Sequence, residues 1–240
     1  MVSSGVCAVV EGVIKGRRYT PRVMEGNQDH SAWMRGLGGR FVVFDGPDGS
    51  GKSTQFHRFA TAVRSAGVVV EETREPGGTS IGERIRDILL DPIHEEMGLR
   101  CEMMLYMASR AQLVEQKIRP SLDRGELVLA DRYVSSTLAY QGAAGGLPRD
   151  EIMAVAKAAC RDAWPDLVVI FDVDERTAAG RLNPLLDRME QKGAEFHAKV
   201  RAGYLDQARA DPDGYVVVDA SADPDTVFQS MLDRVRERLG

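Results

Sequence analysis

The chain reads Gly46-Pro47-Asp48-Gly49-Ser50-Gly51-Lys52-Ser53 at residues 46–53, which is a complete G-x-x-x-x-G-K-S motif. The motif has the flanks that it requires: an apolar run at residues 41–44 precedes it, and an amphipathic helical pattern follows it. Its glycines allow backbone N–H groups to surround a phosphate chain, and the start of the helix adds a positive partial charge. The stretch predicts a phosphate-binding loop between a strand and a helix.

Residues 46–53, together with Thr54, are therefore the candidate site for a nucleoside triphosphate with Mg²⁺. The Lys52 ammonium is expected to reach the β- and γ-phosphates, and the Ser53 hydroxyl is expected to ligate Mg²⁺. The competing interpretation is a glycine-rich turn that binds nothing, but the full motif with both flanks argues strongly against it.

The rest of the chain alternates between short apolar runs and helical periodicity. Runs of buried-strand length occur at residues 41–44, 68–70, 127–130, 167–171 and 215–218. Apolar residues at helical spacing lie in between, including a stripe of Ile81, Ile85, Ile88 and Leu89 and a longer pattern over residues 99–118. This order predicts an α/β fold of the P-loop NTPase type: a five-stranded parallel sheet with helices on both faces and a short lid.

Composition and charge define the extent of the domain and exclude several classes of protein. Residues 1–40 lack strong apolar periodicity and are predicted to be a disordered N-terminal extension, which leaves residues 41–240 as one domain. The alternatives are a start codon assigned too early, since Met34 lies just before the domain, and, less favoured, a targeting peptide. The net charge of −5 argues against a general nucleic-acid binder, and no apolar stretch is long enough to span a membrane. Three widely spaced cysteines suggest neither disulfides nor zinc, so a cytoplasmic location is expected.

The phosphate-binding loop alone leaves two classes of function open: NTP hydrolysis and phosphoryl transfer to a small acceptor. An N-K-x-D base-reading motif, typical of GTPases, is absent, and so is an S-G-G-Q-like transporter ATPase signature. The small size of the chain also favours a kinase. Thr73-Arg74-Glu75-Pro76-Gly77-Gly78-Thr79 follows the second predicted strand, at the sheet edge where ligands bind, and Arg74 there can hold an anionic acceptor.

Together with the loop, residues 73–79 resemble the T-R-E-P-G-G-T segment of thymidylate kinases, and the resemblance extends from about residue 41 to the end of the chain. Residues 105–112, Leu105-Tyr106-Met107-Ala108-Ser109-Arg110-Ala111-Gln112, look like the family's aromatic-x-x-x-Arg helix. Tyr106 and Arg110 share a helix face at i, i+4 spacing. The resemblance implies that Tyr106 stacks on thymine and Arg110 reads the base; the plainer alternative is a core-edge Tyr with a surface Arg.

Two further segments match in order. Asp131-Arg132-Tyr133 resembles the family's D-R-[YH], which implies that Asp131 holds the Mg²⁺ hydration shell and Arg132 the acceptor phosphate. Residues 136–142 resemble S-T-x-A-Y-Q-G, which implies that Thr137, Tyr140 and Gln141 line the deoxyribose and base. Asp48 falls where the family has an acid that contacts the sugar 3′-hydroxyl.

The lid is the least typical part. Arg181 precedes Leu186-Asp187-Arg188-Met189-Glu190, which resembles the family's L-D-R-[MI]-E, but Asn183-Pro184-Leu185-Leu186 replaces a stretch that is more basic in many relatives. The phosphate-binding loop has no Arg, so the catalytic cation is expected from the lid, as Arg181 or Arg188. Lys52, Arg132, Arg181 and Arg188 are therefore the candidate catalytic residues.

The resemblance implies a homodimeric dTMP kinase that makes dTDP from dTMP and ATP, a step in dTTP synthesis. The alternatives are another nucleoside or nucleoside-monophosphate kinase and a P-loop NTPase that is not a kinase.

Overall fold

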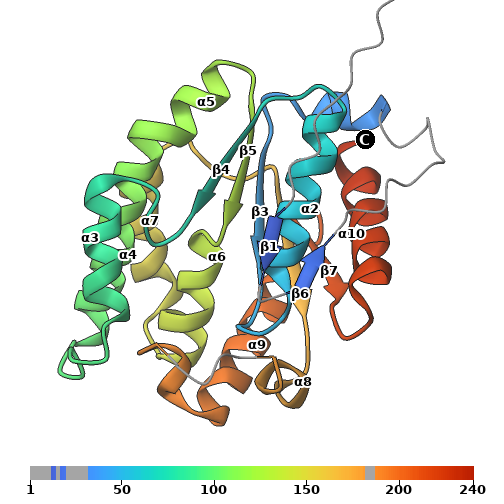
Figure 1. The fold of residues 1–240 in the computed structure, drawn as a ribbon. Helices are drawn as coiled ribbons and strands as arrows, with labels where there is room; N and C mark the ends of the chain where they lie inside the picture. The colour runs from blue at the N-terminus through green and yellow to red at the C-terminus, as the bar shows by residue number, and fades with distance from the viewer. Residues whose placement is uncertain (1–11, 15–16, 20–31, 182–186) are drawn as a thin grey trace, which may run out of the picture.

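The computed structural model describes residues 12–14, 17–19, 32–181 and 187–240 (Figure 1). Its centre is a five-stranded sheet in the order β4-β5-β3-β6-β7, in which every neighbouring pair is parallel. The strands are β3 (Phe41–Asp45), β4 (Val70–Arg74), β5 (Leu127–Asp131), β6 (Leu167–Asp172) and β7 (Tyr215–Asp219). The predicted five-stranded P-loop α/β fold is confirmed.

Two apolar cores lie on opposite faces of this sheet because side chains alternate along each strand. Val42 and Phe44 of β3 face the first core, while Phe41 and Val43 face the second. The first core lies under α2 (Lys52–Ser65) and α10 (Pro224–Leu239), and the second lies under α4 (Leu99–Leu113), α7 (Arg149–Cys160) and α9 (Ala194–Ala210). Parallel strands covered on both faces explain the nearly continuous apolar runs in the sequence.

The helix ends follow local sequence signals. Asp223 accepts hydrogen bonds from the backbone N–H groups of Asp225 and Thr226, and Pro224 occupies the first turn of α10. Thr79 caps α3 (Ser80–Leu90) in the same way, through the N–H of Gly82. The remaining short elements are β1 (Gly12–Ile14), β2 (Arg17–Tyr19), η1 (Arg35–Leu37), η2 (Val114–Ile118), α5 (Arg119–Asp123), α6 (Val134–Thr137), η3 (Leu138–Ala144), α8 (Glu175–Ala179) and η4 (Glu190–Lys192).

The structure displaces one strand predicted from the sequence. The run at residues 68–70 only leads into β4, which continues to Arg74, and Val69 is 64% exposed. An edge strand has one neighbour and tolerates polar residues, so the apolar run is a poor guide to its length. The pattern over residues 99–118 predicted one long helix, and the backbone is helical throughout this range: α4 runs to Leu113 and continues directly into the π-helical turn η2. In the part of the chain that the structure describes, no helix is long and apolar enough to cross a membrane.

The domain begins earlier than residue 41. Met34 and Leu37 are 4% and 0% exposed and belong to the first core, although the sequence analysis assigned both to the extension. The short stretch that carries them has too few residues to display a helical period. Most of the predicted disordered extension, residues 1–11, 15–16 and 20–31, lies outside the described residues, and its disorder stays a prediction.

We expect a truncation that starts at Ala32 to keep the melting temperature and activity of the full chain. Leu37→Ala should instead lower the unfolding free energy by about 2–5 kcal/mol, because it leaves a cavity in the first core. Urea unfolding of the full chain, the truncation and Leu37→Ala checks both statements. A normal stability for Leu37→Ala would contradict the boundary drawn here.

Candidate active site

The phosphate-binding loop joins the carboxyl end of β3 to α2, which begins at Lys52. Close packing explains two of its glycines. A Cβ at Gly46 would lie 2.5 Å from the carbonyl oxygen of Phe171, and one at Gly49 would lie 2.4 Å from that of Ala178; both glycines also have positive φ. The loop can therefore turn tightly in front of the N-terminus of α2, where an anion is stabilised by the free N–H groups.

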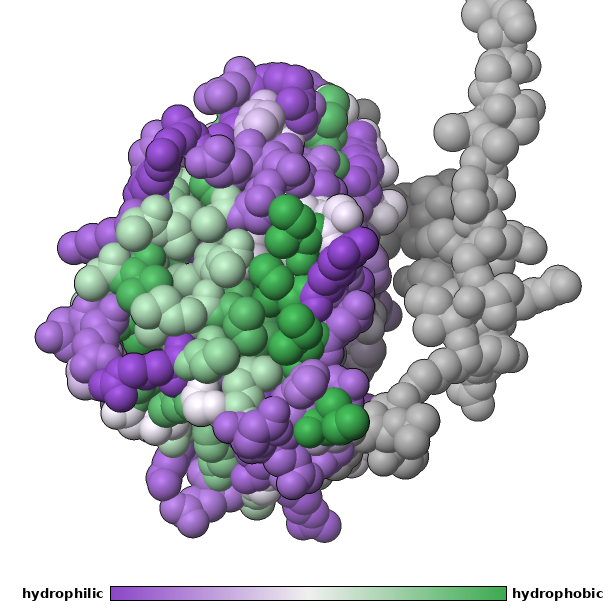
Figure 2. Space-filling model, turned by 90° about the vertical axis from the view of Figure 1, so that its left-hand side faces the viewer, coloured by the Kyte–Doolittle hydropathy of each residue, from purple (hydrophilic) through white to green (hydrophobic). Residues whose placement is uncertain are grey.

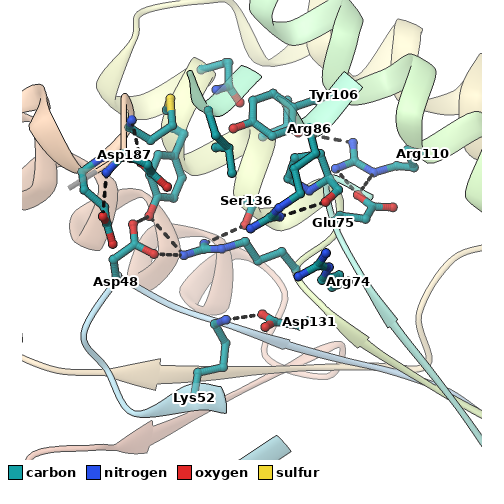
Figure 3. Close-up of a pocket in the computed structure, with 18 of the residues that line it drawn as sticks. Asp48, Lys52, Arg74, Glu75, Arg86, Tyr106, Arg110, Asp131, Ser136 and Asp187 are labelled. Carbon is teal, nitrogen blue, oxygen red and sulfur yellow. Dashed lines mark hydrogen bonds and ion pairs between the residues drawn. The ribbon is translucent and has the colours of Figure 1, made fainter. Parts of the chain in front are cut away.

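A cavity of about 350 Å³ lies beside this loop at the carboxyl ends of the strands (Figure 3). Lys52, Ser53 and Asp131 line it on the side of the loop. All of the residues that the sequence analysis assigned to the acceptor also line it: Asp48, Arg74, Tyr106, Arg110, Arg132, Thr137, Tyr140 and Gln141. The structure thus gathers segments that are far apart in sequence around one space, as the sheet topology requires.

Lys52 and Asp131 form an ion pair where the phosphate-binding loop meets α2, and the Lys52 side chain is only 8% exposed. Burial opposes the ionisation of Asp131, but Lys52 and Arg132 outweigh it and hold its pKa below the ordinary value. The second oxygen of Asp131, Oδ2, has no hydrogen-bond partner within the described part of the chain. A hydroxyl at Ser53 and one carboxylate oxygen at Asp131 suit Mg²⁺, which keeps several of its waters.

Arg132 lies at the centre of the cavity wall, and its backbone has a φ of 72°, which is unusual for a residue other than glycine. Its guanidinium pairs with Asp48 and donates to the hydroxyls of Ser136 at 3.1 Å and Tyr204 at 3.0 Å. Tyr140 donates from its hydroxyl to the other Asp48 oxygen at 2.7 Å. These contacts hold a cation at a set position in the cavity.

The ionisation of Asp48 follows from the same contacts. Burial raises the pKa of this carboxyl, but the Arg132 guanidinium and the Tyr140 hydroxyl outweigh burial and hold the pKa below its ordinary value. Asp48 is therefore an anionic acceptor at neutral pH, which suits the contact with a sugar hydroxyl that the resemblance implied.

Asp45, the last residue of β3, binds Arg132 and was missed by the sequence analysis. It is fully buried and accepts hydrogen bonds from Ser135 at 2.6 Å, Ser136 at 2.8 Å and Tyr204 at 2.6 Å. Arg132 Nη1 lies 3.3 Å from the same carboxylate. In the sequence, only its place directly before the glycine loop pointed to Asp45, because the residues that bind it lie about 90 and 160 residues further on.

The helix α4 supplies the other end of the cavity. Tyr106 and Arg110 lie on its inward face, as the i, i+4 spacing predicted. Arg110 is also deeply buried: its guanidinium donates to Glu75 Oε2 at 2.6 Å, to the carbonyl oxygen of Tyr133 at 2.9 Å and to Thr137 Oγ1 at 3.2 Å. The plainer interpretation, with Arg110 on the surface, does not fit this burial. Arg110 has a structural role in addition to lining the cavity.

Glu75 is the buried partner of Arg110. Burial raises its pKa to about 7 from an ordinary 4.5, although Arg110 acts in the opposite direction. Its second oxygen, Oε1, is buried without a hydrogen-bond partner among the described residues. The carboxyl therefore binds a proton more tightly in the folded protein than in the unfolded chain.

This shift predicts a pH dependence of stability. Between pH 4.5 and about 7 the native state binds the Glu75 proton more tightly, so the unfolding free energy falls as pH rises through this range. Glu75→Gln should lose that part of the dependence. Urea unfolding at several pH values, compared with Glu151→Gln on the exposed face of α7, measures it. Parallel curves for wild type and Glu75→Gln would contradict the prediction.

A second cation, Arg86, lines the cavity and was also missed. It is half-buried on α3 and donates from Nη1 to the carbonyl oxygen of Pro76 at 2.9 Å. Burial and the neighbouring Arg74 lower its pKa below the ordinary value. Arg74, by contrast, is 57% exposed and pairs with Glu83 at 2.9 Å. From sequence alone, a charged residue in an amphipathic helix is expected to face solvent. Only the position of α3 beside the cavity shows that Arg86 lines the site.

The two lid arginines have different surroundings. Arg188 is 9% exposed and donates to Glu102 Oε2 at 2.6 Å and to the carbonyl oxygen of Leu89 at 2.8 Å, and it does not line the cavity. Arg181 is exposed and bonds the carbonyl oxygens of Ala220 and Ser221. A Cβ at Gly51 would lie 3.9 Å from Arg181 Nη1, so this guanidinium lies over the phosphate-binding loop. The part of the predicted lid at residues 182–186 lies outside the described residues.

Comparisons with known proteins agree on one family. The sequence model of the family described as Thymidylate kinase matches residues 44–231. The chain is 44% identical over 204 residues to thymidylate kinase from Deinococcus radiodurans, covering 83% of this chain and 98% of the relative. It is 45% identical over 203 residues to thymidylate kinase from Pseudomonas fluorescens, covering 84% and 96%.

A solved structure agrees with these relatives. The crystal structure of thymidylate kinase from Ehrlichia chaffeensis superposes with a TM-score of 0.68 and 29% sequence identity, covering 83% of this chain and 99% of that one.

Proposed function

Because the chain belongs to the thymidylate kinase family, in which ATP is the phosphate donor, we infer that it transfers a phosphoryl group from ATP to dTMP and releases dTDP. The observation that carries this function is the shared cavity. Residues from the phosphate-binding loop and every residue assigned to the acceptor line one space, so donor and acceptor phosphates can meet there in line.

The donor site consists of residues 46–54, with Lys52 at the β- and γ-phosphates. Ser53 and Asp131 are the residues that would hold Mg²⁺, because they offer a hydroxyl and a carboxylate oxygen at the mouth of the loop. Bound there, Mg²⁺ would neutralise charge on the phosphates. The Lys52–Asp131 pair keeps the ammonium directed at this region before the nucleotide binds.

The acceptor phosphate lies among the arginines of the cavity wall. Arg132 is held by ion pairs with Asp45 and Asp48, and Arg86 of α3 also lines the cavity. A dTMP phosphate oxygen is already anionic, so no general base has to remove a proton before attack. Catalysis then depends on orientation and on cations that neutralise the charge spread over the transferring group.

The lid supplies the remaining cation, and we assign this role to Arg181 rather than Arg188. Arg188 Nε and Nη2 already donate to Leu89 and Glu102. Arg181 is exposed next to Gly51 and is bonded only to two backbone carbonyl oxygens among the described contacts, so it can turn toward a transferring phosphoryl group at low cost.

An acceptor panel tests the proposed function. The enzyme is mixed with ATP, Mg²⁺ and one acceptor at a time, and the nucleoside diphosphate and free phosphate are both measured. Transfer to dTMP supports the proposal. Faster transfer to another nucleotide or nucleoside would indicate a different kinase, and ATP hydrolysis that no acceptor stimulates would indicate a P-loop NTPase that is not a kinase.

The cysteines support a reducing compartment. Cys101 and Cys160 are both free thiols, one exposed and one buried. An exposed free thiol is stable where glutathione keeps cysteines reduced. We therefore propose the cytoplasm as the location.

A second copy of the chain is the proposed partner. Figure 2 shows a hydrophobic area in the middle of the molecular face on the α3–α4 side of Figure 1, bordered by hydrophilic side chains. The helices on this side carry exposed apolar side chains: Ile81 and Ile88 of α3 are 54% and 42% exposed, and Met104 of α4 is 51% exposed. An apolar face of this kind suits a two-fold interface in which each copy covers the other.

We expect Ile81→Lys combined with Ile88→Lys to shift the protein to monomers, because two charges would be buried in the proposed interface. Sedimentation equilibrium measures the mass, and Val69→Lys is the control, since Val69 is 64% exposed beside β4. A double variant with the same mass as wild type would contradict this interface.

A further inference from the structure

Glu102 is a buried carboxylate of α4 that no part of the proposed mechanism uses. It is 1% exposed and accepts hydrogen bonds from three side chains. Arg188 Nη2 donates to Oε2 at 2.6 Å, and Lys192 Nζ lies 3.3 Å and 3.4 Å from Oε2 and Oε1. The remaining donor is Gln141 Nε2, at 2.7 Å from Oε1. Arg188 belongs to the lid motif at residues 186–190, and Lys192 follows that motif closely.

These contacts determine which way the Gln141 amide points. A carboxylate between a guanidinium and an ammonium can only accept hydrogen bonds, so Gln141 must present its NH₂ group to Glu102. Gln141 also lines the cavity, and its other amide atom, Oε1, has no hydrogen-bond partner among the residues that the structure describes. The cavity therefore receives an acceptor from Gln141 rather than a donor.

The position of Glu102 along α4 makes this relevant to the base. Glu102, Tyr106 and Arg110 follow one another at intervals of four residues and share one face of the helix. Tyr106, Arg110 and Gln141 are the residues assigned to the base, and all three line the cavity. The hydrogen-bond acceptor Gln141 Oε1, beside these residues, can bind a ring N–H. Thymine and uracil carry such an N–H at N3, and cytosine does not.

We propose that Glu102 is a positioning residue for base selectivity: with Arg188 and Lys192 it holds the Gln141 amide so that Oε1 accepts from the N3–H of an imide base. This inference rests on the proposed function. It assigns Arg188 a role in selectivity through Glu102, in place of a direct contact with the transferring phosphoryl group.

The isosteric change Glu102→Gln is the sharpest test, because the surroundings dictate how the new amide is oriented. Arg188 and Lys192 can only donate, so they attract its carbonyl oxygen and leave its NH₂ facing Gln141. Gln141 must then turn its own amide to accept that hydrogen bond. Its NH₂ group would face the cavity and oppose the N3–H of thymine.

The experiment measures kcat and KM for dTMP, dUMP and dCMP with ATP saturating. For Glu102→Gln we expect the ratio of kcat/KM for dTMP over dCMP to fall about 10- to 100-fold, mainly through KM for dTMP. The ratio of dTMP over dUMP should stay constant, since both bases carry N3–H. KM for ATP should not change. Glu151→Gln, at an exposed ion pair with Arg100, controls for loss of a carboxylate from the protein.

A double variant keeps the test decisive if Glu102→Gln loses stability. Combining E102Q with Q141E lets the new amide donate to a carboxylate at position 141, whose second oxygen again faces the cavity as an acceptor. The dTMP-over-dCMP ratio should then recover. Equal losses on all three acceptors, or an unchanged ratio for Glu102→Gln, would overturn the proposal. Failure of the wild-type enzyme to phosphorylate dTMP would instead contradict the proposed function.

Discussion

Lys52→Ala is expected to abolish phosphoryl transfer to dTMP while leaving the fold in place. The ammonium is the cation that α2 presents at the phosphate-binding loop, and it lines the cavity rather than the apolar cores. Removing one preorganised donor of this kind costs about 10²–10³-fold in kcat, and here the lost group also carries a full charge. Single-turnover measurement with ATP and dTMP reports the chemical step directly.

The Lys52→Ala experiment needs a control for the lost ion pair with Asp131. Lys117→Ala removes a lysine that pairs with Glu71 at 3.0 Å, does not line the cavity, and should keep full activity. Circular dichroism and a melting curve establish that each variant is folded. A folded Lys52→Ala enzyme with near-normal turnover would refute the assignment of the phosphate-binding loop.

The residues that the sequence analysis grouped at one site, and that line one cavity in the structure, come mainly from motifs of contiguous residues. The loop at residues 46–53, the segment around Arg132 and the residues around Tyr140 each carry their own spacing, and a parallel sheet brings the carboxyl ends of its strands to one edge. The shared cavity therefore followed from the motifs once each motif was attached to a strand end.

The contacts between distant segments could not be predicted in this way. Glu75 and Arg110 are 35 residues apart, and Glu102 and Arg188 are 86 apart. Each of these arginines was assigned a functional role from its motif alone. Their burial depends on how α4 lies against Glu75, directly after β4, and against Arg188. Helical periodicity identifies a face of a helix without identifying what covers it. For the same reason, periodicity did not show that Ile81 and Ile88 of the α3 stripe are exposed while Leu89 of the same stripe is fully buried.

The packing around Arg110 changes what its removal should do. Arg110→Ala deletes the guanidinium that the resemblance assigns to the base, and it also leaves Glu75 buried without a counter-charge. Breaking a buried ion pair from one side costs about 3–5 kcal/mol of unfolding free energy, more than the roughly 1–3 kcal/mol expected for one base contact. We therefore expect lower stability and a raised KM for dTMP together, with KM for ATP little changed.

The two effects of Arg110→Ala can be separated by pH and by a second substitution. Arg110 lowers the pKa of Glu75, so without it that pKa rises further and the carboxyl protonates more readily in the folded variant. The stability deficit relative to wild type should then shrink as pH falls toward about 5. Combining R110A with E75Q should restore stability at neutral pH but leave KM for dTMP high. Recovery of dTMP binding in that double variant would mean that Arg110 acts on the acceptor only by holding Glu75.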